Sequence, residues 1–190
     1  MKVLFLTAYF YPESVASSHL GDNIHMSFTN KGYEIVVYTP TPTRGISKEV
    51  RKEYKKRRLE MMYDGHMTVH RFRLMREGKN PVTRAIRYTI SCIKQLYFGI
   101  FGKDARQCDV MFISSTPPIQ GAMAAIIKKI RRIPFIYNLQ DIFPDSLVGT
   151  GMTKKGSILW KIGRVIENFT YRNADKIIVI AGGNVTAYGP

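Results

Sequence analysis

The sequence predicts an α/β protein with a doubly wound, mostly parallel sheet. Short continuous apolar runs recur along its 190 residues, as is typical of strands that are covered on both faces. Longer segments with apolar residues at helical spacing lie between these runs. Because strands that alternate with helices build parallel sheets, we expect one such domain over residues 1–190.

A strand, a helix and a second strand open the chain. The run KVLFLTA (2–8) is of strand length, and YEIVVYT (33–39) is the next such run, with its strand expected over 34–39. Between them, SHLGDNIHMSFTNKG has an apolar residue at every fourth position and Gly32 at its end, which predicts a helix. This order implies a right-handed crossover between parallel strands.

The middle of the chain is less regular. The charged segment SKEVRKEYKKRRLE (47–60) fits either a short exposed helix or a mobile loop. A hairpin is expected around Asp64 and Gly65. Beyond it, strands are expected over 109–114, 134–139 and 176–180, and helices over 80–102, 117–132 and 154–174.

The first of these later helices contains RAIRYTISCIKQLYFGIF (84–101), which allows two interpretations. Its apolar residues repeat at helical spacing, which is typical of a core helix. The same stripe has basic flanks, which would also suit an amphipathic surface lying on anionic lipid. Both interpretations stay open at this point.

Net charge is +15, and residues 44–106 alone hold 17 basic and 6 acidic residues. Such a basic segment attracts phosphates on nucleic acid, on lipid head groups or on a ligand, unless it is only a solvated face. No nucleic-acid-binding motif accompanies the charge, so a nucleic-acid partner is not expected.

The sequence disfavours several other classes of protein. The chain has neither GxGxxG nor GxxxxGK[ST], so no bound cofactor is expected. The two cysteines show no metal spacing, which suits a reduced cytoplasmic protein without a metal site. No apolar run is long enough to span a bilayer, and the N-terminal run is predicted as a strand and not as a signal peptide.

Four loops follow the first strands of the predicted sheet: 9–19, 39–45, 114–121 and 140–146. Ligands of parallel sheets bind beyond the carboxyl ends of the strands, so we expect these loops to meet at one edge. Taken singly, each loop is equally well explained as an ordinary connection.

The order of seven short motifs carries a family resemblance: PESVASS, KGYEIVVYT, RG, DGHMTVHR, SSTPP, QDIFPDS and ADKIIVI. Together they resemble the N-terminal half of family-4 glycosyltransferases, which have two Rossmann-like domains (the GT-B fold). The resemblance covers nearly all of the chain. It is greatest to the bacterial branch that builds O-antigen and capsular polysaccharide, including fucosamine transferases.

The resemblance implies the acceptor-binding half of a sugar transferase. The nucleotide-sugar donor would bind mainly to a C-terminal domain that is absent here, so the 190 residues alone should be inactive. The acceptor would be a glycan or a polyprenyl-diphosphate-linked sugar, as in lipopolysaccharide synthesis. The protein would lie peripherally on the anionic inner face of the plasma membrane. The alternative is a non-catalytic membrane-docking subunit of a split glycosyltransferase.

The resemblance also implies a site. In related enzymes a residue at the position of Asp141 faces the acceptor hydroxyl, so Asp141 is the expected catalytic residue. The acceptor would be bound by Ser17, Ser18, His19, Thr116, Gln140 and Asp145. Alternatively, both aspartates and both serines could simply cap helices. No DxD motif is present, in agreement with metal-independent transfer.

Overall fold

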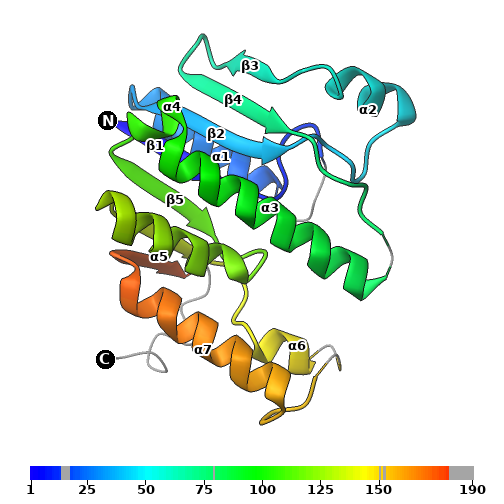
Figure 1. Cartoon of the computed structure of the whole chain (residues 1–190). Coiled ribbons are helices and arrows are strands. Elements are labelled where there is room, and N and C mark those ends of the chain that lie inside the picture. Colours follow the sequence, from blue (N-terminus) through cyan, green and yellow to red (C-terminus); the bar gives the residue numbers. More distant parts are fainter. Residues whose placement is uncertain (14–17, 79, 150, 152, 180–190) are drawn as a thin grey trace. The chain divides into compact units, whose positions relative to one another are not determined.

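The structure is a computed structural model, and it describes residues 1–13, 18–78, 80–149, 151 and 153–179. The chain forms two compact units, Met1–Met111 and Phe112–Pro190. Strands and helices alternate along the chain in both units (Figure 1).

The described residues of the first unit form four strands before α3, β1 (Lys2–Leu6), β2 (Glu34–Pro40), β3 (Leu59–Met62) and β4 (Met67–Phe72). They lie in the order β3-β4-β2-β1. β1 is parallel to β2, and β2 is parallel to β4, as the crossover order predicted. β3 pairs antiparallel with β4, which confirms the hairpin around Asp64 and Gly65.

The apolar runs of these strands form the core of the first unit. Leu4 lies opposite Val36, and Val37 lies opposite Val69, and all four side chains are buried. Because both faces of β1 and β2 are covered, their sequences lack the alternation of a half-exposed sheet.

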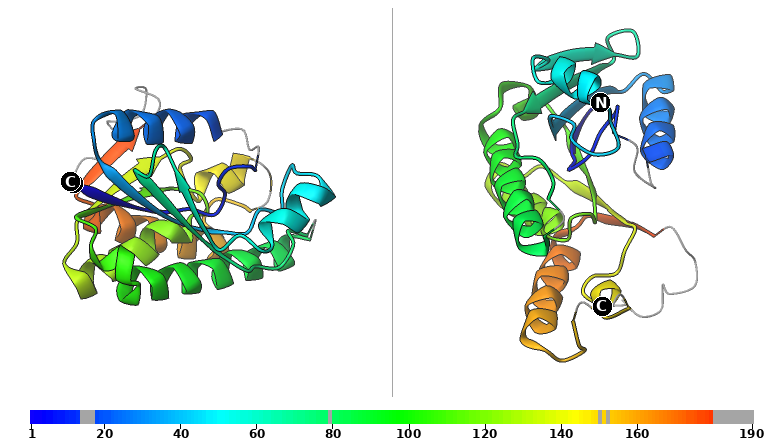
Figure 2. Two further views of the ribbon diagram at one scale, coloured as in Figure 1. Left: turned by 90° about the horizontal axis from the view of Figure 1, so that it is seen from above. Right: turned by 90° about the vertical axis from the view of Figure 1, so that its right-hand side faces the viewer.

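The helices in the described part of this unit are α1 (Ser18–Asn30), α2 (Lys48–Tyr54), α3 (Pro81–Phe101) and α4 (Lys103–Arg106). α1 and α3 cover opposite faces of the sheet (Figure 2). Past the end of α1, Gly32 takes a φ of +74°, a conformation that favours glycine. α3 starts at Pro81, and the Asn80 side chain caps it by accepting a hydrogen bond from the Val82 N–H.

The charged segment after β2 forms a helix, α2. Its first turn is capped by Ser47, whose hydroxyl accepts a hydrogen bond from the Val50 N–H. Its last residue, Tyr54, is buried, and the Arg71 guanidinium lies 4.7 Å from the centre of its ring. A cation–π contact therefore anchors a helix that is otherwise nearly all charged.

The orientation of α3 contradicts the core interpretation for only part of its apolar stripe, since Ile90 and Ile100 are half-buried. Ile86, Ile93 and Tyr97 are all exposed. The buried side of the helix instead carries Arg87 and Gln95. The physical reason is that these polar side chains bond to backbone oxygens of neighbouring loops, which need donors once they are buried.

From Val110 on, the described residues form three strands and three helices, β5 (Val110–Ser114), α5 (Ile119–Arg131), β6 (Phe135–Leu139), α6 (Asp145–Gly149), α7 (Ile158–Asn173) and β7 (Lys176–Val179). The strands lie in the order β5-β6-β7, with β6 parallel to β7. α5 packs tightly at Gly121, because a Cβ there would lie 2.2 Å from Thr170 Cγ2 of α7.

The predicted fold class, an α/β Rossmann-like arrangement with mostly parallel strands, is confirmed. Each predicted strand is present within two residues of its expected ends. Within the described part of the chain, every helix is too short or too polar to cross a bilayer.

Candidate functional site

The loops after β5 and β6 meet at Ser115. Its buried hydroxyl accepts hydrogen bonds from the backbone N–H groups of Gln140 (2.9 Å) and Asp141 (3.2 Å). The Ser115 N–H in turn donates to the Asn138 carbonyl at 3.0 Å. This arrangement brings together the loops that carry Thr116, Gln140 and Asp141 at the carboxyl ends of two strands.

The Asp141 side chain is exposed and chemically available. Among the described residues, its carboxylate has no hydrogen-bond or ion-pair partner. Around α6, the Ser146 N–H bonds to the Ile142 carbonyl and the Leu147 N–H to the Pro144 carbonyl, so Asp141 is not the cap of this helix. A free carboxylate held by its own backbone can accept a proton or orient a hydroxyl.

Asp145 is placed differently from Asp141. It begins α6, and its carboxylate accepts hydrogen bonds from Trp160 Nε1 (2.9 Å) and Arg164 Nη2 (2.6 Å) of α7. The hydrogen bond from Trp160 and the nearby Arg164 guanidinium hold the pKa of Asp145 below its ordinary value. Both carboxylate oxygens therefore connect the loop after β6 to α7, and the expected contact of Asp145 with an acceptor stays a prediction.

Glu167, a buried carboxylate of α7, adds to the contacts between this helix and the loop after β6. Glu167 of α7 accepts hydrogen bonds from Arg164 Nη1 at 2.8 Å and from the Tyr171 hydroxyl. Burial raises the pKa of Glu167, while the Tyr171 hydroxyl, the Arg164 guanidinium and the Phe143 backbone N–H oppose that shift. α7 approaches the loop closely at Gly163, where a Cβ would lie 2.6 Å from the Phe143 ring.

Three of the expected site residues, Ser17, Ser18 and His19, belong to the first unit. Ser18 and His19 are the first two residues of α1, at the N-terminal end of the helix after β1. Ser17 lies outside the described residues. The proposed contacts of these three residues with an acceptor stay predictions.

The first unit has its own polar cluster beyond the carboxyl ends of β1 and β2. Glu13, which is buried, accepts hydrogen bonds from the backbone N–H groups of Thr43 (2.7 Å) and Arg44 (2.9 Å). Arg87 of α3 is fully buried and donates to Thr43 Oγ1 and to the Met75 carbonyl, both at 3.1 Å. These contacts fix the loop after β2 against the loop after β1.

Tyr9 extends this cluster toward solvent. Its hydroxyl lies 2.8 Å from the Tyr88 hydroxyl and donates to Glu77 Oε2 at 2.9 Å. Burial raises the pKa of Tyr9, and the hydrogen bond with Tyr88 adds to the shift. The exposed Arg44 guanidinium lies 5.5 Å from the centre of the Tyr9 ring. The phenol therefore stays neutral beside an exposed cation.

Sequence reasoning did not single out Glu13, Arg87 or Glu167. Arg87 and Glu167 lie within predicted helices, where a charged residue is ordinarily exposed. A usable signal was the i, i+4 and i, i+3 spacing of Trp160, Arg164 and Glu167, which places them on one side of α7. Within the described ranges, no group of three or more metal-ligating side chains is present.

Comparison with known proteins gives a family match over most of the chain. A family model described as "Glycosyl transferase 4-like domain" matches residues 27–185. A "probable glycosyltransferase WbjE" of Pseudomonas aeruginosa is 24% identical over 108 residues, which are 57% of this chain and 25% of that protein.

Solved structures are similar in fold. The Anabaena protein Alr3699/HepE in complex with UDP and glucose has a TM-score of 0.52 and 18% identity, over 98% of this chain and 40% of that one. Its complex with UDP-glucose gives a TM-score of 0.51, also with 18% identity, over 98% of this chain and 39% of that one. The chain thus spans well under half the length of these relatives.

Proposed function

Because the chain belongs to the glycosyl transferase 4-like domain family, we propose that it is the acceptor-binding half of a glycosyltransferase. The observation that carries this proposal is the exposed Asp141 carboxylate, whose backbone is fixed by Ser115 at a strand end. Thr116 and Gln140 lie in the same pair of joined loops and would contact the acceptor. Ser17, Ser18, His19 and Asp145 are the other proposed acceptor contacts.

In the proposed reaction, an acceptor hydroxyl attacks the anomeric carbon of a nucleotide-sugar. The bond between that carbon and the nucleotide diphosphate breaks, and the diphosphate leaves with the bonding electrons. The hydroxyl proton passes to Asp141, which acts as a general base. The ion pair between Asp145 and Arg164 would keep the loop after β6 in place during the transfer.

The nucleotide-sugar donor is supported by the UDP and UDP-glucose bound to HepE, the structural neighbour. We propose that the donor is held mainly by a second, C-terminal domain, which agrees with the 40% of HepE that the chain covers. The 190 residues alone would then bind acceptor but transfer little or no sugar.

The proposed acceptor is a glycan or a polyprenyl-diphosphate-linked sugar in the synthesis of a surface polysaccharide such as O-antigen or capsule. The excess of basic residues over 44–106 supports an anionic partner of this kind. The same charge supports peripheral binding at the cytoplasmic face of the membrane. Membership of the fucosamine-transferase branch is part of this proposal.

The alternative is a non-catalytic membrane-docking subunit of a split glycosyltransferase, which recruits a separate catalytic chain. An NMR titration of the 190-residue chain separates acceptor binding from this role. We expect a short-chain prenyl-diphosphate-linked sugar to shift the amide signals of Thr116, Gln140 and Asp141, and UDP-glucose to shift them much less. Shifts with neither compound, or with UDP-glucose alone, would contradict the acceptor-binding proposal.

A further inference from the structure

α3 presents an apolar stripe to solvent. We name as the α3 stripe the five residues Val82, Ile86, Ile93, Tyr97 and Phe101, which follow one another at intervals of four or seven positions. Such intervals keep side chains on one side of a helix. Their exposed fractions lie between 48% for Ile86 and 68% for Tyr97. The stripe runs almost the full length of a 21-residue helix, about 30 Å.

Contacts made by the opposite side of α3 prevent the helix from rotating about its axis to bury the stripe. Gln95 Nε2 donates to the Thr7 carbonyl at 2.9 Å, and the Phe98 ring stacks on Tyr38 at 4.0 Å. Arg87 bonds to Thr43 and to the Met75 carbonyl. Rotating the helix to bury the stripe would break these contacts and leave the Thr7 and Met75 carbonyls without these donors. The internal contacts of the first unit therefore keep the apolar residues outside.

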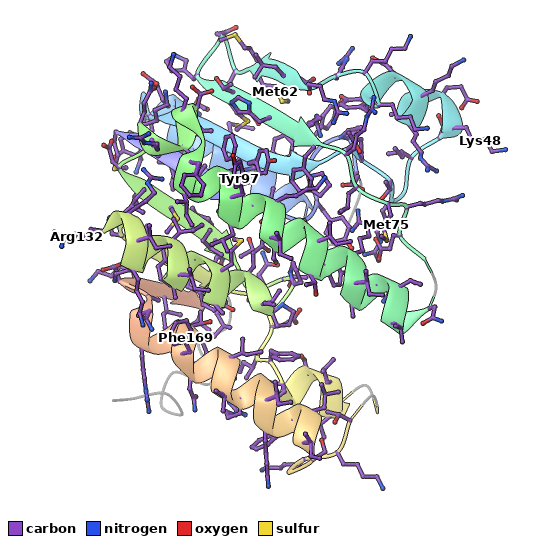
Figure 3. All side chains as sticks on the ribbon, viewed as in Figure 1. Lys48, Met62, Met75, Tyr97, Arg132 and Phe169 are labelled. Atoms are coloured by element: carbon purple, nitrogen blue, oxygen red, sulfur yellow. The ribbon has the colours of Figure 1, made fainter. Side chains whose placement is uncertain are left out.

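Basic residues border the α3 stripe. The segment after β4 runs beside α3, because Lys94 Nζ donates to the Arg73 carbonyl at 2.9 Å. This segment exposes Arg73, Met75 and Arg76, and the labelled Met75 and Tyr97 show the positions of the segment and the helix in Figure 3. Two further exposed basic residues, Lys103 and Arg106, lie in α4 directly after the end of α3. The stripe is thus an apolar surface with exposed basic residues beside the segment after β4 and at the C-terminal end of the helix.

We propose that the α3 stripe is a membrane-docking surface that inserts into the head-group region of an anionic lipid bilayer. An apolar helix face with basic edges is the pattern of helices that lie in this region. The aromatic rings of Tyr97 and Phe101 suit the boundary between head groups and acyl chains. Arg73 and Arg76 would meet lipid phosphates.

This inference rests on the membrane association proposed above and adds the surface that performs it. It also changes the expected character of the binding, from electrostatic alone to electrostatic and apolar together. A contiguous apolar stripe of this length is unusual on a soluble monomer, and its charged border favours a bilayer over an apolar protein surface.

Vesicle co-sedimentation tests the proposal. The chain is mixed with vesicles of phosphatidylcholine and phosphatidylglycerol, and the test variant is Ile93→Ser with Tyr97→Ser. The matched control is Ile158→Ser with Val165→Ser, which removes two residues that are at least as exposed on α7. We expect the α3 variant to lower the partition coefficient at least about tenfold and the α7 variant to leave it nearly unchanged. Thermal midpoints should not change, because all four side chains are exposed.

Three results would overturn the inference. The wild-type chain could fail to bind anionic vesicles, or the α3 and α7 variants could lose binding equally. Alternatively, sedimentation equilibrium without lipid could show self-association that Ile93→Ser with Tyr97→Ser abolishes, which would assign the stripe to a protein contact. The NMR titration with a soluble acceptor tests the proposed function without vesicles, so the two proposals can fail separately.

Discussion

The Ser115 hydroxyl accepts a hydrogen bond from the backbone N–H of Asp141 at 3.2 Å and so links the loops that follow β5 and β6. The same oxygen accepts from Gln140 at 2.9 Å. One buried side chain therefore fixes the backbone from which the free Asp141 carboxylate projects.

Ser115→Ala should loosen this loop. It removes the acceptor for two backbone N–H groups, and we expect a loss of about 1–3 kcal/mol in the free energy of unfolding. Hydrogen exchange at the Gln140 and Asp141 amides should become faster than in the wild type. Ser114→Ala, one residue earlier, is the control and should leave both amides unchanged. Unchanged exchange in Ser115→Ala would mean that other contacts hold the loop.

Arg87 and Arg84 lie on the same helix and should differ strongly in their effect on stability. Arg87 is fully buried and bonds to two loops, whereas Arg84 is exposed and pairs with Glu77 at 3.4 Å. We expect Arg87→Met to lower the free energy of unfolding by about 2–4 kcal/mol and Arg84→Met by less than about 1 kcal/mol. Urea denaturation measures both, and equal losses would contradict the anchoring role of Arg87.

His25 should make the stability of the fold depend on pH. It is buried in α1 beside the rings of Phe5 and Phe10, and burial lowers its pKa to about 4. In the unfolded chain this group takes up a proton near pH 6.5, so the unfolded state binds more protons between these values. Stability should therefore be complete above about pH 6.5 and fall by up to about 3 kcal/mol as pH drops to 4.

Thermal or urea unfolding between pH 7 and pH 4 measures this loss. His25→Leu should remove most of the loss of stability that occurs as pH drops from 7 to 4. His66→Leu, at an exposed hairpin position, should leave this loss unchanged. A pH profile that is identical in wild type and His25→Leu would contradict the assignment.

Salt should weaken binding to anionic vesicles without abolishing it. The basic border acts through charge, which is screened as salt rises toward about 0.5 M, whereas the α3 stripe acts through apolar contact. Arg73→Gln with Arg76→Gln should reduce binding at low salt, and the control Lys52→Gln with Lys56→Gln, on or just after α2, should reduce it less. Complete loss of wild-type binding at high salt would indicate an electrostatic surface without insertion.

The strands were predictable from the sequence because continuous apolar runs of five to seven residues between turn residues are characteristic of buried strands. The orientation of α3 was not predictable, because its apolar residues repeat at the spacing of a core helix. Only the fold reveals that the Thr7 and Met75 carbonyls require the donors of Gln95 and Arg87. The sequence pattern carries no information about such distant backbone groups.

The candidate site was also predictable only in part. The expected joining of the loops around Thr116 and Asp141 follows from the rule for strand ends, and the contacts of Ser115 agree with it. The partners of Asp145 could not be foreseen, because Trp160 and Arg164 lie 15 and 19 residues further along the chain. Likewise, the contact of Tyr54 with Arg71 that anchors α2 depends on tertiary structure.

Asp141→Asn tests the proposed function most directly, in an enzyme that carries the donor-binding domain. The substitution keeps the size of the side chain and removes its ability to take a proton. We expect kcat to fall by about 10²- to 10⁴-fold while the KM for the acceptor changes little. The thermal midpoint should stay the same, because the described residues give this carboxylate no partner. Asp64→Asn in the exposed hairpin turn is the control and should keep full activity. Unchanged kcat in Asp141→Asn would contradict the catalytic role.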